Sequence, residues 1–181
     1  MSAAHVISVA KSAGHTFSKQ VVPSIEIVTG LGVVGDCHAG VTVKHRSRVR
    51  VDPTQPNLRQ VHLIHSELFE ELAAQGHVVK PGDLGENIST RGVDLLGLPR
   101  GSVLHIGPDV ALEVTGLRNP CDQIENFQSG LLSKLVMKMS DGQLVRKSGI
   151  MTIVLKGGSV SGGHDIIVQL PPEPHVALER V

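Results

Sequence analysis

The sequence predicts a mainly β domain, closed or partly closed as a barrel, with two or more helices. About seven short β-prone runs alternate with glycine- and proline-rich turns, and two stretches have helical periodicity. Hydrophobic residues make up 40% and charged residues 19% of the 181-residue chain, which is the composition of a globular protein with a buried core. This length is short for two full-sized domains, so residues 1–181 are expected to form one domain.

The first third of the chain is predicted to contain two strands and a long loop. Residues 5–10 and 21–28 are rich in β-prone side chains, and a small-residue turn follows at 30–32. Residues 41–57 end in a turn-rich segment and are expected to form a surface loop. This loop carries five basic side chains: Lys44, His45, Arg46, Arg48 and Arg50.

The middle of the chain is predicted to contain a strand, a helix and a polar turn. Residues 60–64 have strand composition, and Ser66 is placed to cap a helix that ends at Gly76. The side chains expected to face inward are Leu68, Phe69 and Leu72. A turn at 81–83 then leads to a short segment at 86–90.

The last part of the chain is predicted to contain four strands and one helix. Strands are expected at 102–106 and 110–115, joined by a tight turn at 107–109, and again at 150–155 and 164–170. The apolar spacing over 122–139 predicts a helix, although Gly130 weakens it. Prolines stop the last strand, so residues 171–181 are expected to be a peripheral tail.

Composition excludes several classes of function. Lys and Arg together number 17 and so do Asp and Glu, so the chain lacks the net positive charge of proteins that coat nucleic acid or anionic membranes. The absence of Trp and Tyr argues against a single-strand-binding module. The two cysteines form no zinc or disulfide pattern, and no secretion signal or membrane span is apparent. We therefore expect a cytoplasmic protein without nucleic-acid or membrane partners.

Cys121 is the residue most suggestive of chemistry. It follows a β run and begins the predicted second helix, where the helix N-terminus and Arg118 would stabilise a thiolate. A thiolate there can act as a nucleophile, carry sulfur as a persulfide or bind a soft metal. The alternative of equal weight is a buried cysteine that only fills space.

Three further segments have the composition of ligand-binding turns, and each also has a plainer interpretation. The backbone of residues 82–92 and the side chains of Asn87, Ser89, Thr90 and Arg91 suit a polar or phosphorylated ligand, or a self-capped turn. Asp36 and His38 could face a ligand, whereas a Cys37–His38 metal pair has no second pair to complete it. The basic loop suits an oxyanion or plain solvation.

Taken in order, four segments resemble the MOSC domain, named from the C-terminal part of molybdenum-cofactor sulfurase. They are GVVGDCHAG at 32–40, QVHLIHSE at 60–67, GENIST at 85–90 and RNPC at 118–121. Each segment is weak alone, and their order and spacing give the specificity. The resemblance spans about residues 5–170, so this would be a stand-alone member of the family.

The resemblance implies a β-barrel-like fold that binds the molybdenum cofactor, a phosphorylated pyranopterin dithiolene. The family's characteristic cysteine matches Cys121, which would bind molybdenum or carry a persulfide. Residues matched to the pterin pocket are Gly85, Glu86, Asn87 and Thr90, and those beside the metal are Arg118 and Asn119. The other residues expected at the cofactor are Asp36, His38, Lys44, Arg46 and Arg91.

The sequence also departs from the family pattern. Cys37 stands where relatives commonly have arginine, and the N-terminal barrel extension of the amidoxime reducers is absent. No pyridoxal-phosphate domain is present, so pyridoxal phosphate is not expected in this chain.

The residues and the resemblance together suggest three possible functions. The first is an oxidoreductase that reduces N-hydroxylated small molecules, with Cys121 as molybdenum ligand and a separate electron donor. The second is a sulfur carrier, sulfurtransferase or cofactor chaperone with a persulfide on Cys121 supplied by a cysteine desulfurase. The third is a small-anion-binding protein without this chemistry.

Overall fold

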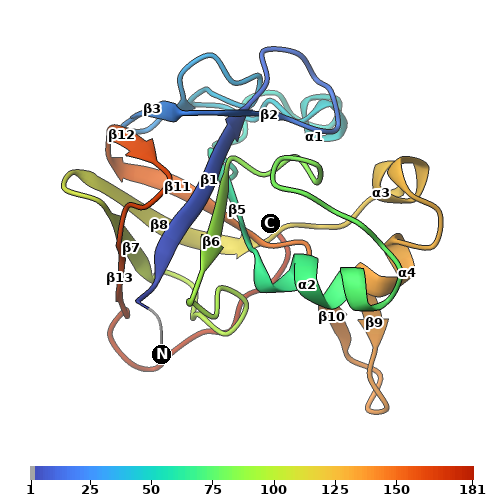
Figure 1. The fold of residues 1–181 in the computed structure, drawn as a ribbon. Helices are drawn as coiled ribbons and strands as arrows, with labels where there is room; N and C mark the ends of the chain where they lie inside the picture. The colour runs from blue at the N-terminus through green and yellow to red at the C-terminus, as the bar shows by residue number, and fades with distance from the viewer. Residues whose placement is uncertain (1–2) are drawn as a thin grey trace.

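A computed structural model describes residues 3–181 and is dominated by one large sheet (Figure 1). Its eight strands lie in the order β13-β7-β8-β11-β5-β6-β1-β2, and all neighbours are antiparallel except β5 and β6. The strands are β1 (His5–Lys11), β2 (Gln20–Val22), β5 (Val61–His65), β6 (Ile88–Arg91), β7 (Val103–Ile106), β8 (Val110–Leu117), β11 (Ile150–Lys156) and β13 (Ile166–Gln169).

A second sheet and a hairpin complete the β structure. The second sheet has the order β12-β3-β4, with β3 (Ser24–Val28), β4 (Gly32–Val33) and β12 (Gly158–Ser161). The hairpin pairs β9 (Val136–Lys138) with β10 (Leu144–Arg146) and projects from the lower right of Figure 1. The helices are α1 (Arg46–Val49), α2 (Glu67–Ala74), α3 (Asp122–Phe127) and α4 (Leu132–Leu135).

The mainly β prediction is confirmed, with local corrections. The run at 21–28 is divided at Pro23 into β2 and β3, which belong to different sheets. The glycine-rich segment 157–163 was expected to be a connection, yet it contains β12, which pairs with β3. Glycine-rich composition hid this strand because its partner lies more than 100 residues earlier in the sequence.

The predicted barrel is not supported, because the large sheet remains open with β13 and β2 as its edges. The start of β1 does meet the segment before β13, where the Val6 amide donates to the His164 carbonyl at 2.8 Å. This contact includes only one isolated bridge, between His5 and Asp165. No ladder of strand pairs closes the sheet within the described residues.

The predicted cap at Ser66 is wrong. The backbone of Ser66 is already helical, its hydroxyl makes no capping hydrogen bond, and the oxygen is buried without a partner. The helix it precedes is nevertheless confirmed as α2, and it buries Leu68 and Leu72 as expected. Burial of this apolar face, not a capped N-terminus, stabilises α2.

The predicted helix over 122–139 is also wrong in its extent. The chain forms α3 and α4 with a break at Gly130, whose φ of 81° lies in the left-handed region, and then continues as β9. The Glu125 carboxylate accepts hydrogen bonds from the amides of Gly130 and Leu132 at 2.7 and 3.3 Å. These bonds stabilise the break that the apolar spacing alone does not reveal.

Two apolar clusters form the core. The larger one lies among the strands and includes Leu63, Ile106 and Leu112. The smaller one packs α2, α3 and α4 beside β5, and consists of Ile64, Leu68, Leu72, Val79, Leu84, Ile124, Leu131 and Leu135. Phe17, in the segment after β1, packs against this second cluster.

The tail at 171–181 is mostly exposed, as expected of a peripheral segment, but it pairs with the sheet. The Leu117 amide donates to the Glu179 carbonyl at 2.7 Å, and the Val181 amide donates to the Leu117 carbonyl at 3.2 Å. The tail is thus docked on the end of β8. In the part of the chain that the structure describes, no helix is both long and apolar enough to cross a membrane.

Candidate functional site

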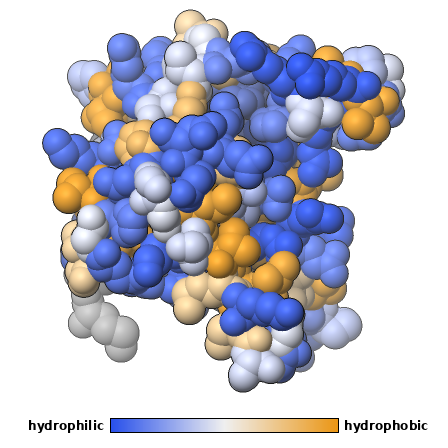
Figure 2. Space-filling model, turned by 90° about the vertical axis from the view of Figure 1, so that its right-hand side faces the viewer, coloured by the Kyte–Doolittle hydropathy of each residue, from blue (hydrophilic) through white to orange (hydrophobic). Residues whose placement is uncertain are grey.

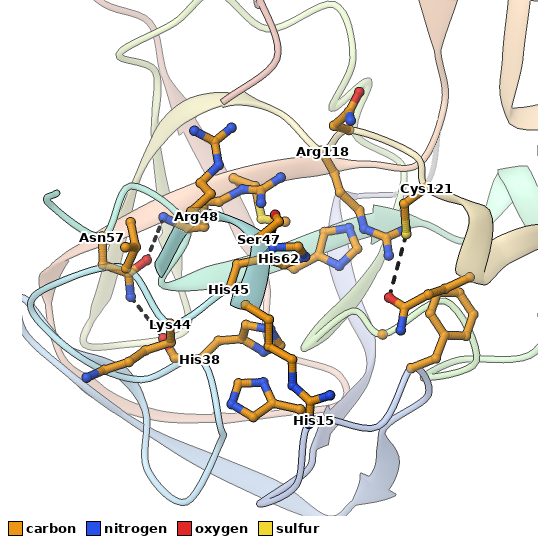
Figure 3. Close-up of a pocket in the computed structure, with 18 of the residues that line it drawn as sticks. His15, His38, Lys44, His45, Ser47, Arg48, Asn57, His62, Arg118 and Cys121 are labelled. Atoms are coloured by element: carbon orange, nitrogen blue, oxygen red, sulfur yellow. Dashed lines mark hydrogen bonds between the residues drawn. The ribbon is translucent and has the colours of Figure 1, made fainter. Parts of the chain in front are cut away.

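A pocket of about 410 Å³ lies where the loop after β1, the basic loop at 41–57 and the start of α3 meet (Figure 3). Its size is that of a site for a small molecule or cofactor. The view of this side in Figure 2 has hydrophilic residues gathered in its upper part. The basic residues that line the pocket are Lys19, Lys44, Arg46, Arg48, Arg50, Arg59 and Arg118.

Cys121 lines this pocket at the N-cap position of α3. The segment 118–120 connects it to the end of β8, where the Arg118 amide donates to the Gly149 carbonyl at 3.0 Å. Cys121 is partly exposed, has an extended backbone and is a free thiol. Its Sγ lies 3.6 Å from Oε1 of Gln123, a weak contact that leaves the sulfur available. The thiol is therefore accessible to a pocket ligand and is not core filling.

Two pocket arginines have buried nitrogens without partners. Nη1 of Arg118 and Nε of Arg59 are inaccessible to solvent and have no hydrogen-bond acceptor. Burial lowers the pKa of Arg59 to about 10 and also lowers the pKa of Arg118, while the negative charge of a Cys121 thiolate raises both. Neither arginine forms an ion pair among residues 3–181. A bound anion would supply the missing counter-charge.

The basic loop contributes its charges from above the pocket. Lys44, Arg46 and Arg50 are exposed, and α1 gives the loop one turn of helix. His45 differs from them, because burial and then the charge of Arg59 lower its pKa to about 4. His45 is accordingly neutral at pH 7, and the loop's positive charge comes from its lysine and arginines.

A buried polar network around Asn87 forms one wall of the pocket. Asn87 Nδ2 donates to Asp36 Oδ2 at 3.0 Å and to the Ala10 carbonyl at 3.1 Å, and its Oδ1 accepts from the His62 amide at 3.2 Å. Asp36 in turn pairs with Lys19, 2.8 Å away. Burial would raise the pKa of Asp36, but hydrogen bonding to His38 and the Lys19 charge lower it well below its usual range. The network joins β1 and β6 to the turn after β4.

Most of the residues proposed from the sequence meet at this pocket. Those that line it are His38, Lys44, Arg46, Gly85, Asn87, Arg118, Asn119 and Cys121. Asp36 lies behind the wall and contacts the pocket residues His38 and Asn87.

Besides Asp36, three proposed residues lie outside the pocket lining. Glu86 is fully buried and accepts from the Gly82 amide at 2.6 Å and from the Ser89 hydroxyl at 3.0 Å. Burial raises the pKa of its carboxyl. Thr90 is fully buried in β6, and Arg91 pairs with Glu70 at the surface, 2.6 Å away. These positions make Glu86 and Thr90 interior residues of the turn and strand that support Gly85 and Asn87.

Several pocket residues were not expected from the sequence. His15, Phe17 and Arg59 are isolated in the sequence and reach the pocket through tertiary contacts. His62 belongs to β5. It is buried, with Nε2 2.8 Å from the Ser148 carbonyl, but it also lines the pocket, and burial lowers its pKa well below the usual value. No local pattern distinguishes these four residues.

The MOSC domain model matches residues 35–167. The YuaD protein from Bacillus subtilis is similar over 94% of this chain and 98% of its own, with 25% identity and a TM-score of 0.73. YiiM from Geobacillus stearothermophilus is 17% identical, over 92% of this chain and 75% of its own, with a TM-score of 0.63. YiiM from Escherichia coli is 18% identical, over 95% of this chain and 73% of its own, with a TM-score of 0.62. These identities with YiiM show a shared fold. No curated protein matches the sequence.

The family model covers well over half of the sequence, from the turn that holds Asp36 to β13, and the chain therefore belongs to the MOSC domain family.

Proposed function

We propose that this protein binds the molybdenum cofactor in the pocket and reduces N-hydroxylated small molecules there. The observation that carries the proposal is that one pocket holds an accessible thiol and two half-buried arginines that form no ion pair among residues 3–181. Cys121 would be the thiolate ligand of molybdenum, and Arg59 and Arg118 would bind an anionic part of the cofactor. Membership of the MOSC family supports this assignment.

The residues present fit such a group. A thiolate is a soft ligand of the kind that suits a metal already bound by dithiolene sulfur. The guanidinium groups of Arg118 and Arg59 line the pocket without an ion-pair partner among residues 3–181, and they suit phosphate or pterin oxygens. The exposed side chains of the basic loop extend this cationic surface. When bound, the cofactor would supply the two-electron redox chemistry that protein side chains lack.

The protein's own contribution would be to orient and to stabilise charge. The Arg118 guanidinium lines the same pocket as Cys121 and is oriented by the Phe17 ring, whose centroid is 5.7 Å from Cζ. Asn87 uses both its donor and acceptor atoms within the wall, so it shapes the pocket and leaves ligand recognition to Asn119 and the arginines. A small N-hydroxylated substrate would approach from the open side, and a separate protein would donate electrons.

A second candidate is a sulfur carrier or cofactor chaperone. Cys121 is the cysteine of the pocket, since Cys37 does not line it. A Cys121 thiolate could therefore accept the outer sulfur of a desulfurase persulfide without a second pocket thiol to resolve it. Such a carrier would need Cys121 but no bound molybdenum.

The deciding experiment is to express the protein in a host with intact cofactor synthesis and to quantify molybdenum, pterin and sulfur on Cys121. The reductase proposal predicts near-stoichiometric molybdenum and pterin, with both lowered in Arg118→Gln and molybdenum lowered in Cys121→Ser. Arg100→Gln, an exposed arginine outside the pocket lining, is the matched control and should retain both. Thermal unfolding would confirm that each variant is folded.

The outcomes separate the two candidates. Wild-type protein with neither molybdenum nor pterin would refute the cofactor proposal. One added sulfur on Cys121 after incubation with a cysteine desulfurase and cysteine, detected by mass spectrometry and absent in Cys121→Ser, would then support the carrier. Protein that contains neither molybdenum nor pterin, and whose Cys121 thiol is still unmodified after incubation with the desulfurase and cysteine, would refute both candidates.

A further inference from the structure

Three potential metal ligands meet at the side of the pocket away from Cys121. His15, Cys37 and His38 each offer one ligand atom, and these atoms all lie within 4.8 Å of one another. Sγ of Cys37 is 3.2 Å from Nδ1 of His38, and the rings of His15 and His38 meet edge to face with centroids 5.6 Å apart. Figure 3 shows His15 and His38 together in the lower part of the pocket, with Cys121 at its upper right.

Backbone hydrogen bonds bring these residues together from two distant segments. The Cys37 amide donates to the carbonyl of Ser12, just beyond β1, at 2.8 Å. The Ser12 amide donates to the Asp36 carboxylate at 3.3 Å. Gly35 has a φ of 79°, which allows the tight turn that precedes Asp36. These bonds hold the turn with Cys37 and His38 beside the segment that carries His15.

Asp36 provides the outer support that metal-binding histidines commonly have. Its Oδ1 accepts from the His38 amide at 3.0 Å and lies 3.3 Å from Nδ1 of the His38 ring. Asp36 is itself buried and paired with Lys19, so its position is fixed. A carboxylate in this place orients the imidazole and increases its basicity as a ligand.

We propose that His15, Cys37 and His38 form a second metal site, which binds Zn²⁺ through one thiolate and two imidazoles. Zn²⁺ takes Cys sulfur and His nitrogen as ligands, and three protein ligands leave its fourth tetrahedral position open. That position would face the pocket, because His15 and His38 line it whereas Cys37 lies behind. The site uses Cys37, the residue that departs from the arginine common at this place in the family, and it does not depend on the function proposed for Cys121.

The surrounding charges bear on the strength of this site. The Asp36 carboxylate and the Cys37 thiolate favour a cation, while the charges of Lys19 and Arg46 oppose it. His15 is exposed, so its side chain can move toward the other two ligands when a metal binds. We therefore expect reversible binding that is weaker than that of a closed structural zinc centre.

The test is to titrate metal-free protein with Zn²⁺ in competition with a chromophoric chelator, and with Co²⁺ as a spectroscopic probe. Wild type should bind one Zn²⁺, and the Co²⁺ form should show thiolate-to-metal charge-transfer absorption. Cys37→Ser should abolish that absorption, and both Cys37→Ser and His15→Gln should weaken Zn²⁺ binding by at least about 10-fold. His105→Gln, on β7 and outside the pocket, is the matched control and should bind normally.

Cys121→Ser distinguishes this site from the one proposed above. If Cys37 is the ligand, Cys121→Ser retains the charge-transfer absorption and the Zn²⁺ affinity. Absorption that is lost in Cys121→Ser and kept in Cys37→Ser would overturn the proposal, as would unchanged Zn²⁺ affinity in His15→Gln. Because His15 is exposed, its substitution should leave the protein folded, so the last result would be unambiguous.

Discussion

Replacing Asp36 by Asn should destabilise the protein far more than the loss of an ordinary ion pair. The substitution keeps the shape of the side chain and removes its charge, which leaves the Lys19 ammonium without its partner 2.8 Å away. The two side chains are only 3% and 2% exposed. Breaking a buried pair from one side costs about 3–5 kcal/mol. Lys19 lines the pocket, so water there offsets part of this cost, and we expect a loss of about 3 kcal/mol.

The matched control is the exposed pair between Lys156 and Asp109. Its atoms are 3.4 Å apart and its side chains are 63% and 59% exposed, so Asp109→Asn should change stability by less than about 1 kcal/mol. Urea unfolding at pH 7 gives both free energies, provided that the m-values are unchanged. Adding Lys19→Met to Asp36→Asn should recover part of the loss, because the unpaired buried charge is then gone. Equal effects of Asp36→Asn and Asp109→Asn would refute this account of the pocket wall.

Three further predictions concern local features. Ser66→Ala should alter the unfolding free energy by less than about 0.5 kcal/mol, because the hydroxyl neither caps α2 nor has a partner; a loss above about 1 kcal/mol in urea unfolding would indicate a real cap. Gly149→Ala should lower the melting temperature much more than Gly76→Ala. Both glycines have a positive φ, but only at position 149 would a Cβ clash with a backbone atom, the Leu63 carbonyl oxygen. Similar melting temperatures for the two variants would contradict this. His62 should make stability fall as pH decreases below about 6.5, because the unfolded imidazole takes up a proton that the buried one does not. The free energy of unfolding then falls by up to about 1.4 kcal/mol per pH unit. His62→Gln should flatten the plot of this free energy, measured in urea, against pH, whereas an unchanged slope would count against the role of His62.

Local sequence patterns predicted the β framework well because alternation and turn residues act over a few positions. The strands β7 and β8 and the turn between them at 107–109 were found in this way. The same reasoning failed over 122–139, where apolar residues at helical spacing belong to two helices and a strand. Glu125 fixes the break at Gly130 through side-chain contacts that periodicity does not include.

The candidate site was predictable only where a motif marks it. Cys121 and Arg118 lie in one short segment beside the end of β8, so a local pattern identified them together. Arg59, just before β5, and His15, in the loop after β1, line the same pocket although both are far from Cys121 in the sequence. Their positions depend on strand order and loop packing, which a single sequence without a three-dimensional arrangement does not specify.

The pairing of Leu117 with Glu179 and Val181 has a practical consequence for work on this protein. Leu117 directly precedes Arg118, so the last residues stabilise the strand end from which the pocket arginine projects. Gly116 has no room for a Cβ against the Glu179 carbonyl, which shows how closely the two segments approach. Substitutions among residues 179–181 would therefore act on the pocket from outside its lining, through the backbone of β8.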